Sequence, residues 1–132
     1  MSAPVLHADL PSTGWRDITG LAQHPVQRLL VRRDGPLVTL SAYGLTVTAG
    51  TRTLVSVLAL PGVRPPSELV AQGVVILDDA GGTILGKLQA NAGGSIEWKC
   101  PATSTSKAYG YMQWVCTSPM LAPGGWPGVA YP

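Results

Sequence analysis

The sequence predicts an all-β domain, a single antiparallel β-sandwich of jelly-roll type that carries a short, extended N-terminal arm. No segment longer than about ten residues repeats its apolar residues with the period of a helix. About eight short segments instead alternate apolar and polar residues, as strands with one buried face do. The 132 residues also include 16 Gly and 12 Pro without a regular repeat, which favours frequent turns between short strands.

The chain divides into an arm and one domain. Residues 1–13 contain two Pro, one His and only scattered apolar residues, so they predict an extended arm without a core of its own. Residues 14–132 form the predicted sandwich domain, which is long enough for one buried core. Its last segment, residues 119–132, is rich in Pro and Gly and predicts an irregular tail.

The first predicted strands surround a tight turn. Two apolar segments, residues 26–31 and 37–40, flank residues 32–35 (RRDG), and Asp-Gly readily supplies the positive φ angles of a hairpin turn. Pro36 has no N–H to close a two-residue turn, so a longer loop is an alternative. Residues 45–48 and 53–60 form the next predicted strands, around a turn at residues 49–50.

The second half of the chain predicts a further series of strands. Residues 73–77 and 83–88 are predicted strands, with turns at 78–82 (DDAGG) and 91–94 (NAGG). In residues 95–100, Ile96, Trp98 and Cys100 share one face of a strand, and Glu97 and Lys99 share the other.

The last predicted strand spans residues 109–116. Met112, Trp114 and Cys116 share its predicted inner face, and Tyr111, Gln113 and Val115 lie on the opposite one. The Ser/Thr-rich segment 101–108 before it is predicted to be a loop.

Charge is scarce in this chain. Charged residues make up 12% of it, about half the share of an average soluble domain, which favours burial of surface in an oligomer or a larger assembly. The net charge is +2, and no basic cluster exceeds the pair Arg32-Arg33, so nucleic-acid binding is not expected. No apolar segment predicts a membrane span or a signal peptide, so membrane insertion and secretion are not expected either.

The titratable residues do not predict an enzyme, a cofactor or a metal site. His7 and His24 are isolated in the sequence, whereas zinc ligands occur as closely spaced pairs. A carbohydrate-active enzyme, the alternative, would need two converging carboxylates. Outside the arm and the predicted turns, Asp17, Glu68 and Glu97 are the candidates.

An Asp pair and three Gly pairs are candidate ligand sites. Asp78 and Asp79 could begin a calcium loop, but the following Ala-Gly-Gly offers no alternating oxygen ligands, and Asp is favoured in turns for its backbone hydrogen bonds. The Gly pairs 81–82, 93–94 and 124–125 are not followed by a predicted helix whose N-terminus could hold a phosphate. Both sets are therefore predicted to be turn residues.

Cys100 and Cys116 each follow a Trp by two residues. A disulfide between them is one alternative. A symmetric hairpin across residues 101–108 would place Cys100 opposite Gly110, away from Cys116. That geometry, with the lack of a secretion signal, favours two buried free thiols.

Four residues are candidates for contact with a partner. Trp15 and Trp126 lie in Gly/Pro-rich segments near the two ends, where a Trp could anchor an interface. Arg16 and Arg64 could add hydrogen bonds to a partner. A sugar-binding platform built from the four Trp is an alternative, but Trp98 and Trp114 are predicted to be core residues.

Five segments resemble the C-terminal β domain of minor tail proteins from phages that infect actinobacteria. The resemblance covers about residues 14–128, and its motifs are residues 14–21 (GWRDITGL), 30–35 (LVRRDG), 60–65 (LPGVRP), 111–115 (YMQWV) and 126–128 (WPG). It implies a virion component assembled in the host cytoplasm, with a β-sandwich that forms a homotrimer exposed on the particle.

Two virion roles follow from this resemblance. The first is a tail-associated protein that takes part in particle assembly or touches the host surface, where other tail proteins or a host cell-surface glycan would be its partners. The second is a capsid decoration protein that stabilises the phage head through its N-terminal arm, with the major capsid protein as partner. Family members usually carry a long N-terminal anchoring region, and only the arm 1–13 is expected in that place here.

Overall fold

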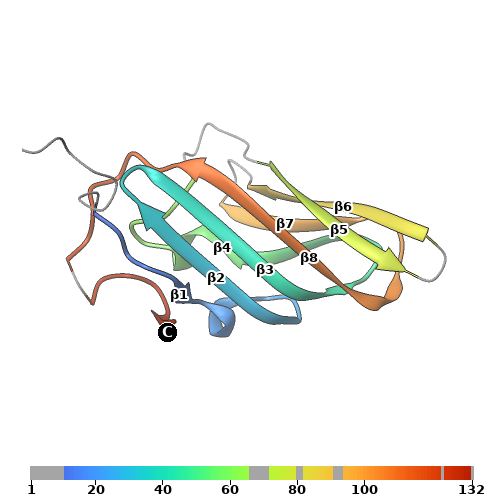
Figure 1. The fold of residues 1–132 in the computed structure, drawn as a ribbon. Coiled ribbons are helices and arrows are strands. Elements are labelled where there is room, and N and C mark those ends of the chain that lie inside the picture. Colours follow the sequence, from blue (N-terminus) through green and yellow to red (C-terminus); the bar gives the residue numbers. More distant parts are fainter. Residues whose placement is uncertain (1–10, 66–71, 80–81, 91–93, 123, 132) are drawn as a thin grey trace, which may run out of the picture.

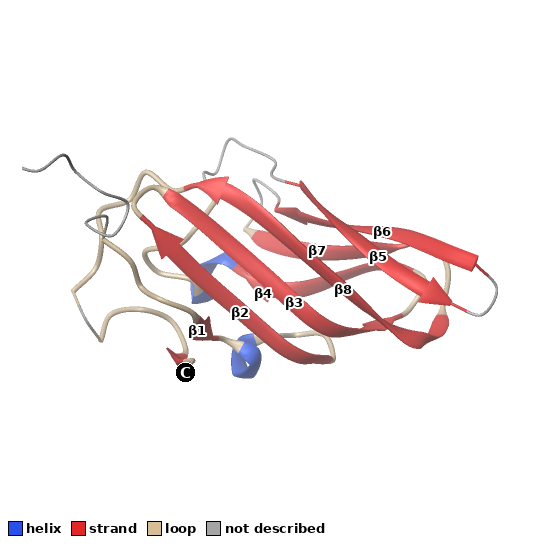
Figure 2. Cartoon of the chain, in the orientation of Figure 1, coloured by secondary structure: helices blue, strands red, loops and turns tan. Residues whose placement is uncertain are grey.

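The computed structural model describes residues 11–65, 72–79, 82–90, 94–122 and 124–131. Within these ranges the chain is built from antiparallel strands, and its helical part consists of two 3₁₀ turns, η2 (Thr19–Leu21) and η3 (Val57–Ala59) (Figure 2). The strands are β1 (Arg16–Asp17), β2 (Val26–Asp34), β3 (Leu37–Val47), β4 (Gly50–Ser56), β5 (Gln72–Asp79), β6 (Gly82–Ala90), β7 (Ser95–Cys100), β8 (Ser104–Val115) and β9 (Val129–Ala130). The predicted all-β fold is confirmed.

The strands form a sandwich of two layers. They are hydrogen-bonded in the order β4-β7-β6-β5-β8-β3-β2-β1-β9. The five strands β9-β1-β2-β3-β8 form one layer and β4-β7-β6 the other, and β5 pairs with both β6 and β8 where the layers meet (Figure 1). Strand β3 pairs with β8, β4 with β7, and β5 with β6, a nested arrangement typical of jelly rolls.

The core lies between the two layers. Trp98 of β7 crosses it and donates a 3.1 Å hydrogen bond from Nε1 to the carbonyl of Thr46 in β3. The predicted inner faces of residues 95–100 and 109–116 are confirmed, since their inward side chains are all buried. Fully buried residues come from both layers and include Leu29, Val31, Val38, Leu40, Leu45, Leu54, Leu88 and Ile96.

The hairpin between β2 and β3 has a two-residue loop. Asp34 and Leu37 are opposite each other in the ladder, and Gly35 has a φ of 55°. The N–H that closes such a turn belongs to the residue after the loop, here Leu37. Pro36 therefore loses no turn hydrogen bond, and the longer loop weighed from the sequence is wrong.

Strand β3 is longer than expected, because residues 41–44 continue it. Gly44 has a φ of 73° and lies at a shift in the β3–β8 register between Tyr43 and Leu45. A glycine with positive φ allows such a bulge. The side chain of Gln27 occupies the space where a Cβ of residue 44 would lie, so the strand continues across a bulge that only Gly accommodates.

Three boundaries differ from expectation. Strand β8 begins at Ser104, so the predicted loop 101–108 is wrong, and its polar residues extend an exposed strand end beside β3. Strand β4 ends at Ser56, where the Ser hydroxyl accepts a 3.3 Å hydrogen bond from Leu58 N and caps the turn η3. Of the predicted arm, residues 1–10 lie outside the described residues, while Thr13 N donates to Arg33 O at 2.9 Å.

Candidate binding surface

All four tyrosines of the chain lie on the outer face of the five-stranded layer. Tyr43 of β3 is directly opposite Tyr109 of β8, and Ser41 is opposite Tyr111. Tyr131, just after β9, packs against Arg28, the outward neighbour of Tyr43 on β2. We call the four residues Tyr43, Tyr109, Tyr111 and Tyr131 the tyrosine face.

The tyrosine face exposes much aromatic surface. Tyr43, Tyr109 and Tyr111 are 54%, 48% and 59% exposed, and the apolar Leu37 and Val115 extend the exposed surface along the same two strands. Tyr is enriched at protein interfaces because its ring buries a large apolar area at a low conformational cost and its hydroxyl still hydrogen-bonds. A face of this composition is suited to binding.

Side chains on this face hold one another in place. The rings of Tyr43 and Tyr109 meet edge to face, with centroids 4.8 Å apart, a favourable aromatic geometry. Repulsion from the ionised hydroxyl of Tyr43 raises the pKa of Tyr109. Desolvation and a hydrogen bond between the two side chains add to the effect. Gln113 Nε2 donates a 3.0 Å hydrogen bond to Thr39 Oγ1 on the neighbouring strand.

Two arginines extend the aromatic surface across β2. The Arg28 guanidinium lies 4.8 Å from the centroid of the Tyr131 ring and donates a hydrogen bond to the Tyr131 hydroxyl. Arg32 lies 5.9 Å from the Trp15 ring centroid and forms a 2.9 Å ion pair with Asp34. Stacking of this kind fixes the planar guanidinium while leaving its other edges to bind a partner.

A groove of about 480 Å³ crosses β2 at the Tyr131 end of the tyrosine face. Its walls come from β2, β3 and the segment after β9. The lining residues are Gln27, Arg28, Leu30, Ser41, Tyr43 and Tyr131.

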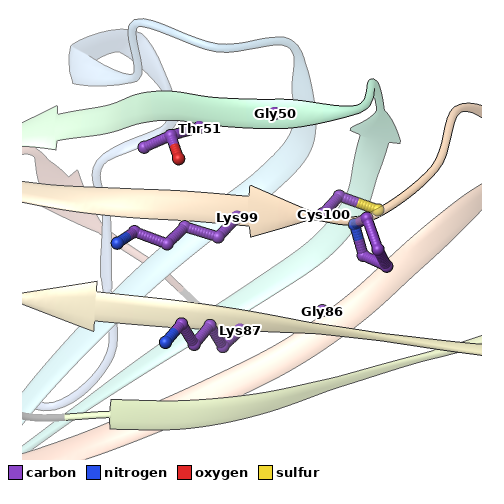
Figure 3. A pocket seen from close by; sticks show the side chains of 7 residues that line it. Gly50, Thr51, Gly86, Lys87, Lys99 and Cys100 are labelled. Atoms are coloured by element: carbon purple, nitrogen blue, oxygen red, sulfur yellow. The ribbon is translucent and has the colours of Figure 1, made fainter.

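A hollow of about 420 Å³ opens on the three-stranded layer (Figure 3). Thr51, Lys99 and Lys87 are in register across β4, β7 and β6, and the two lysine side chains extend in the same direction. Directly opposed like charges cost free energy in a sheet. The Cys100 thiol, at the end of the hollow, donates to Ala102 O at 3.0 Å.

A third hollow, of about 430 Å³, lies between the segment before β2, the end of β3 and the start of β4. His24 and Arg52 line it together with threonine side chains. His24 is buried, and its Nε2 is 2.6 Å from Thr46 O, so the imidazole joins the segment before β2 to the end of β3.

The four residues expected from the sequence to contact a partner all interact with other residues of the same chain. Arg16 donates to the carbonyls of Pro127 and Gly128 at 3.1 and 2.8 Å. Trp15 accepts a 2.9 Å backbone hydrogen bond from Tyr131 N, and its ring lies near Arg32.

Trp126 and Arg64 make other contacts within the chain. Trp126 is partly buried against the core, where its ring occupies the space beside Gly62. Arg64 is exposed and donates a 3.3 Å hydrogen bond to Leu58 O. Trp15, Arg16 and Trp126 therefore take part in contacts within the chain, and their contact with a partner stays a prediction.

Sequence reasoning missed the tyrosine face. The alternation of residues 109–116 placed Tyr111 on an outer face, and this was the available signal. Tyr43 lay in a segment without a predicted strand, and Tyr131 lay in the predicted irregular tail. Their position beside Tyr109 depends on the pairing of β8 with β3, which the local pattern does not encode.

The described residues offer no metal centre. Among them, no group of three or more His, Cys, Asp or Glu lies close enough to hold an ion; the side chains of Asp78 and Asp79 lie outside that set. Cys100 and Cys116 are both buried and free. The predicted hairpin between their strands is wrong, because Cys100 is opposite Gly50 of β4, and β8 pairs with β3 and β5.

Comparison of the chain with protein-family models, with curated proteins and with solved structures found no match. No helix within the described ranges is long and apolar enough to cross a membrane.

Proposed function

We propose that this chain is a binding domain of a phage particle, a tail-associated virion protein that contacts the host surface through its tyrosine face. The observation that carries this proposal is the concentration of all four tyrosines on one outer sheet face, bordered by Arg28 and Arg32. Tyr, Trp and Arg supply most binding hot spots, because they bury large surfaces while keeping hydrogen-bonding groups.

The resemblance to phage tail domains supports the virion part of the proposal. Its motifs contribute Arg16, Arg33, Gly62 and Gly128 to contacts that hold the chain together. Within the tyrosine face, Tyr43, Tyr109 and Tyr131 lie outside those motifs, and Tyr111 is the first residue of the motif 111–115. We infer that the shared motifs mainly maintain the sandwich, while Tyr43, Tyr109 and Tyr131 carry the recognition specific to this chain.

We propose a homotrimer as the working form. Three copies of a modest binding face on one particle raise the overall affinity through effective concentration. The scarcity of charged residues, 12% of the chain, supports burial of part of the surface between copies. Light scattering on the purified chain tests the stoichiometry, and a monomer at micromolar concentration would contradict it.

We propose that the domain binds without catalysis. The carboxylates with described side chains are Asp17, Asp34 and Glu97, on β1, β2 and β7. Asp17 and Asp34 are engaged locally, with Thr19 and Arg32, and Glu97 belongs to the opposite layer. Glycoside hydrolysis needs two carboxyl groups within roughly 10 Å of each other across a substrate. Turnover of a glycan that Glu97→Gln abolishes would contradict this view.

Cryo-electron microscopy of intact particles tests the proposal. We expect density for this sandwich at the tail, with the tyrosine face directed outward. Density on the capsid lattice would favour the decoration role instead, and absence from particles would refute both.

A variant phage carrying Tyr109→Ala and Tyr111→Ala tests the face itself. We expect it to assemble normally but adsorb to cells at least about tenfold more slowly, because two exposed anchors are lost. Gln113→Ala, on the same strand and face, is the matched control and should adsorb normally. Normal adsorption by the double variant would contradict a role of this face in host contact.

A further inference from the structure

We propose that the groove lined by Tyr43 and Tyr131 is a saccharide-binding site that takes one pyranose ring of a surface glycan. This inference rests on the proposed function of the tyrosine face and names the ligand class of one part of it. The volume of about 480 Å³ falls within the range of roughly 300–1,000 Å³ that small-molecule sites occupy.

The arrangement of the groove suits the two chemical sides of a pyranose. Tyr43 on β3 and Tyr131 beyond β9 border it on opposite sides of β2, since the sheet order is β3-β2-β1-β9. A pyranose has a face of C–H groups, and these carry partial positive charge. The negative face of an aromatic ring attracts such groups, as it attracts the positive edge of a second ring.

Polar side chains in the groove match the hydroxyl groups of a sugar. Each sugar hydroxyl donates one hydrogen bond and accepts others, so its site needs donors and acceptors together. Arg28 provides donors only, while the Gln27 amide and the Ser41 hydroxyl provide both. None of the six lining residues is a carboxylate, so no lining side chain repels the negative charge of a uronic acid.

The walls of the groove are held before a ligand arrives. Tyr43 is supported by the edge of Tyr109, with a centroid distance of 4.8 Å. Arg28 is stacked on Tyr131 and bonded to its hydroxyl. A site whose side chains are already ordered loses less conformational entropy on binding.

A glycine leaves room for one of the groove side chains. Gln27 lies in the space that a side chain at Gly44 would fill, so the β3 bulge positions this amide. Of the other two hollows, one has no aromatic lining residue, and the aromatic ring in the lining of the other is the buried His24 imidazole, which is already engaged with Thr46 O. The stacking surface that a pyranose needs therefore assigns the saccharide to this groove.

The purified chain is tested on an array of neutral and uronic-acid oligosaccharides, and the strongest binder is then titrated by two-dimensional NMR. We expect a dissociation constant between about 10 μM and 1 mM per site, with shifts at Tyr43, Ser41 and Tyr131. Tyr43→Ala should weaken binding at least about tenfold. Leu58→Ala removes an exposed side chain on η3, outside the tyrosine face, and should leave binding unchanged.

Several outcomes would overturn the inference. These are an array with no bound saccharide, equal effects of Tyr43→Ala and Leu58→Ala, or NMR shifts confined to another surface. Gln27→Ala serves as a second groove variant should Tyr43→Ala unfold. If no saccharide binds while Tyr109→Ala with Tyr111→Ala still slows adsorption, the groove inference fails and the proposed function survives.

Discussion

The guanidinium of Arg33 donates a 2.6 Å hydrogen bond to the carbonyl of Ser118, which joins the end of β2 to the chain beyond β8. Arg33 is only 4% exposed. It also donates to the carbonyls of Gly35 and Gly62, each at 2.7 Å, and to the carbonyl and Sγ of Cys116 at 3.5 Å. All five N–H groups thus have an acceptor, and backbone carbonyls compensate most of the buried charge.

We expect Arg33→Met to lower the free energy of unfolding by about 3 kcal/mol or more, because several buried carbonyls lose their donor. Urea denaturation of the purified variant measures this change. Arg32→Met is the matched control, since its neighbouring guanidinium forms a half-exposed ion pair with Asp34. The control should lower the free energy of unfolding by less than about 1 kcal/mol. Equal decreases in the two variants would contradict a stabilising role of the Arg33 hydrogen bonds.

Four of the five segments that resemble phage tail domains meet in space. The segment 14–21 contacts 126–128 where Arg16 binds the Gly128 carbonyl. The segment 30–35 contacts 60–65 where Arg33 binds Gly62. The Trp126 ring packs beside Gly62 and joins the two pairs. These motifs therefore act together as a structural network at one end of the sandwich.

We expect Arg16→Ala to release the C-terminal segment locally without unfolding the sandwich. Two hydrogen bonds to the carbonyls of Pro127 and Gly128 are lost, which weakens the pairing of β1 with β9. Amide hydrogen exchange at Tyr131, whose N–H bonds Trp15, should accelerate at least about tenfold. Arg64→Ala removes only one 3.3 Å bond and should leave that exchange rate unchanged.

The fold class and the inward residues of β7 and β8 could be predicted from the sequence. Alternation with a period of two fixes which side chains share a face, so the burial of Trp98 and Trp114 followed from pattern alone. The strands with which β7 and β8 pair could not be predicted from this alternation. A local hairpin of residues 95–116 was expected, but β7 pairs with β4 and β6, because the nested roll joins strands far apart in sequence.

The candidate surface was less predictable than the fold. Trp15, Arg16 and Trp126 stood out because large or charged residues beside Gly and Pro resemble interface anchors. Contacts within a chain use the same residue types, and the sequence pattern cannot distinguish such contacts from an interface with a partner. Tyr43 and Tyr109 become neighbours only through the β3–β8 register, which depends on long-range pairing and on the Gly44 bulge.

Gly86 lies under the indole of Trp98, and a test of core packing follows. A Cβ at residue 86 would overlap the indole ring and lie 2.7 Å from the backbone carbonyl of Lys99. We expect Gly86→Ala to lower the free energy of unfolding by about 1–3 kcal/mol, because backbone cannot yield as a flexible side chain can. Gly20→Ala, with no atom within 4 Å of its Cβ, should change stability by less than about 0.5 kcal/mol. Urea denaturation followed by Trp fluorescence compares the two.

The last prediction concerns the carboxylate of Asp17. Its Oδ1 accepts hydrogen bonds from Thr19 Oγ1 at 2.6 Å and Thr19 N at 2.9 Å. These bonds, with a smaller effect of the Arg28 charge, hold the pKa of Asp17 below its ordinary value of 3.8. Because the folded pKa is depressed, the ionised carboxylate adds stability that is complete above the unfolded pKa and is lost as the pH falls through the folded one.

Asp17→Asn keeps an acceptor for Thr19 but removes the charge, so it isolates this effect. We expect the variant to be less stable than the parent chain at neutral pH and equally stable below the folded pKa of Asp17, where the parent carboxyl is protonated. Urea midpoints measured across the acid range test this convergence. A stability difference that stays constant with pH would show that the geometry of the Asp17–Thr19 turn, and not the charge, is what the substitution changes.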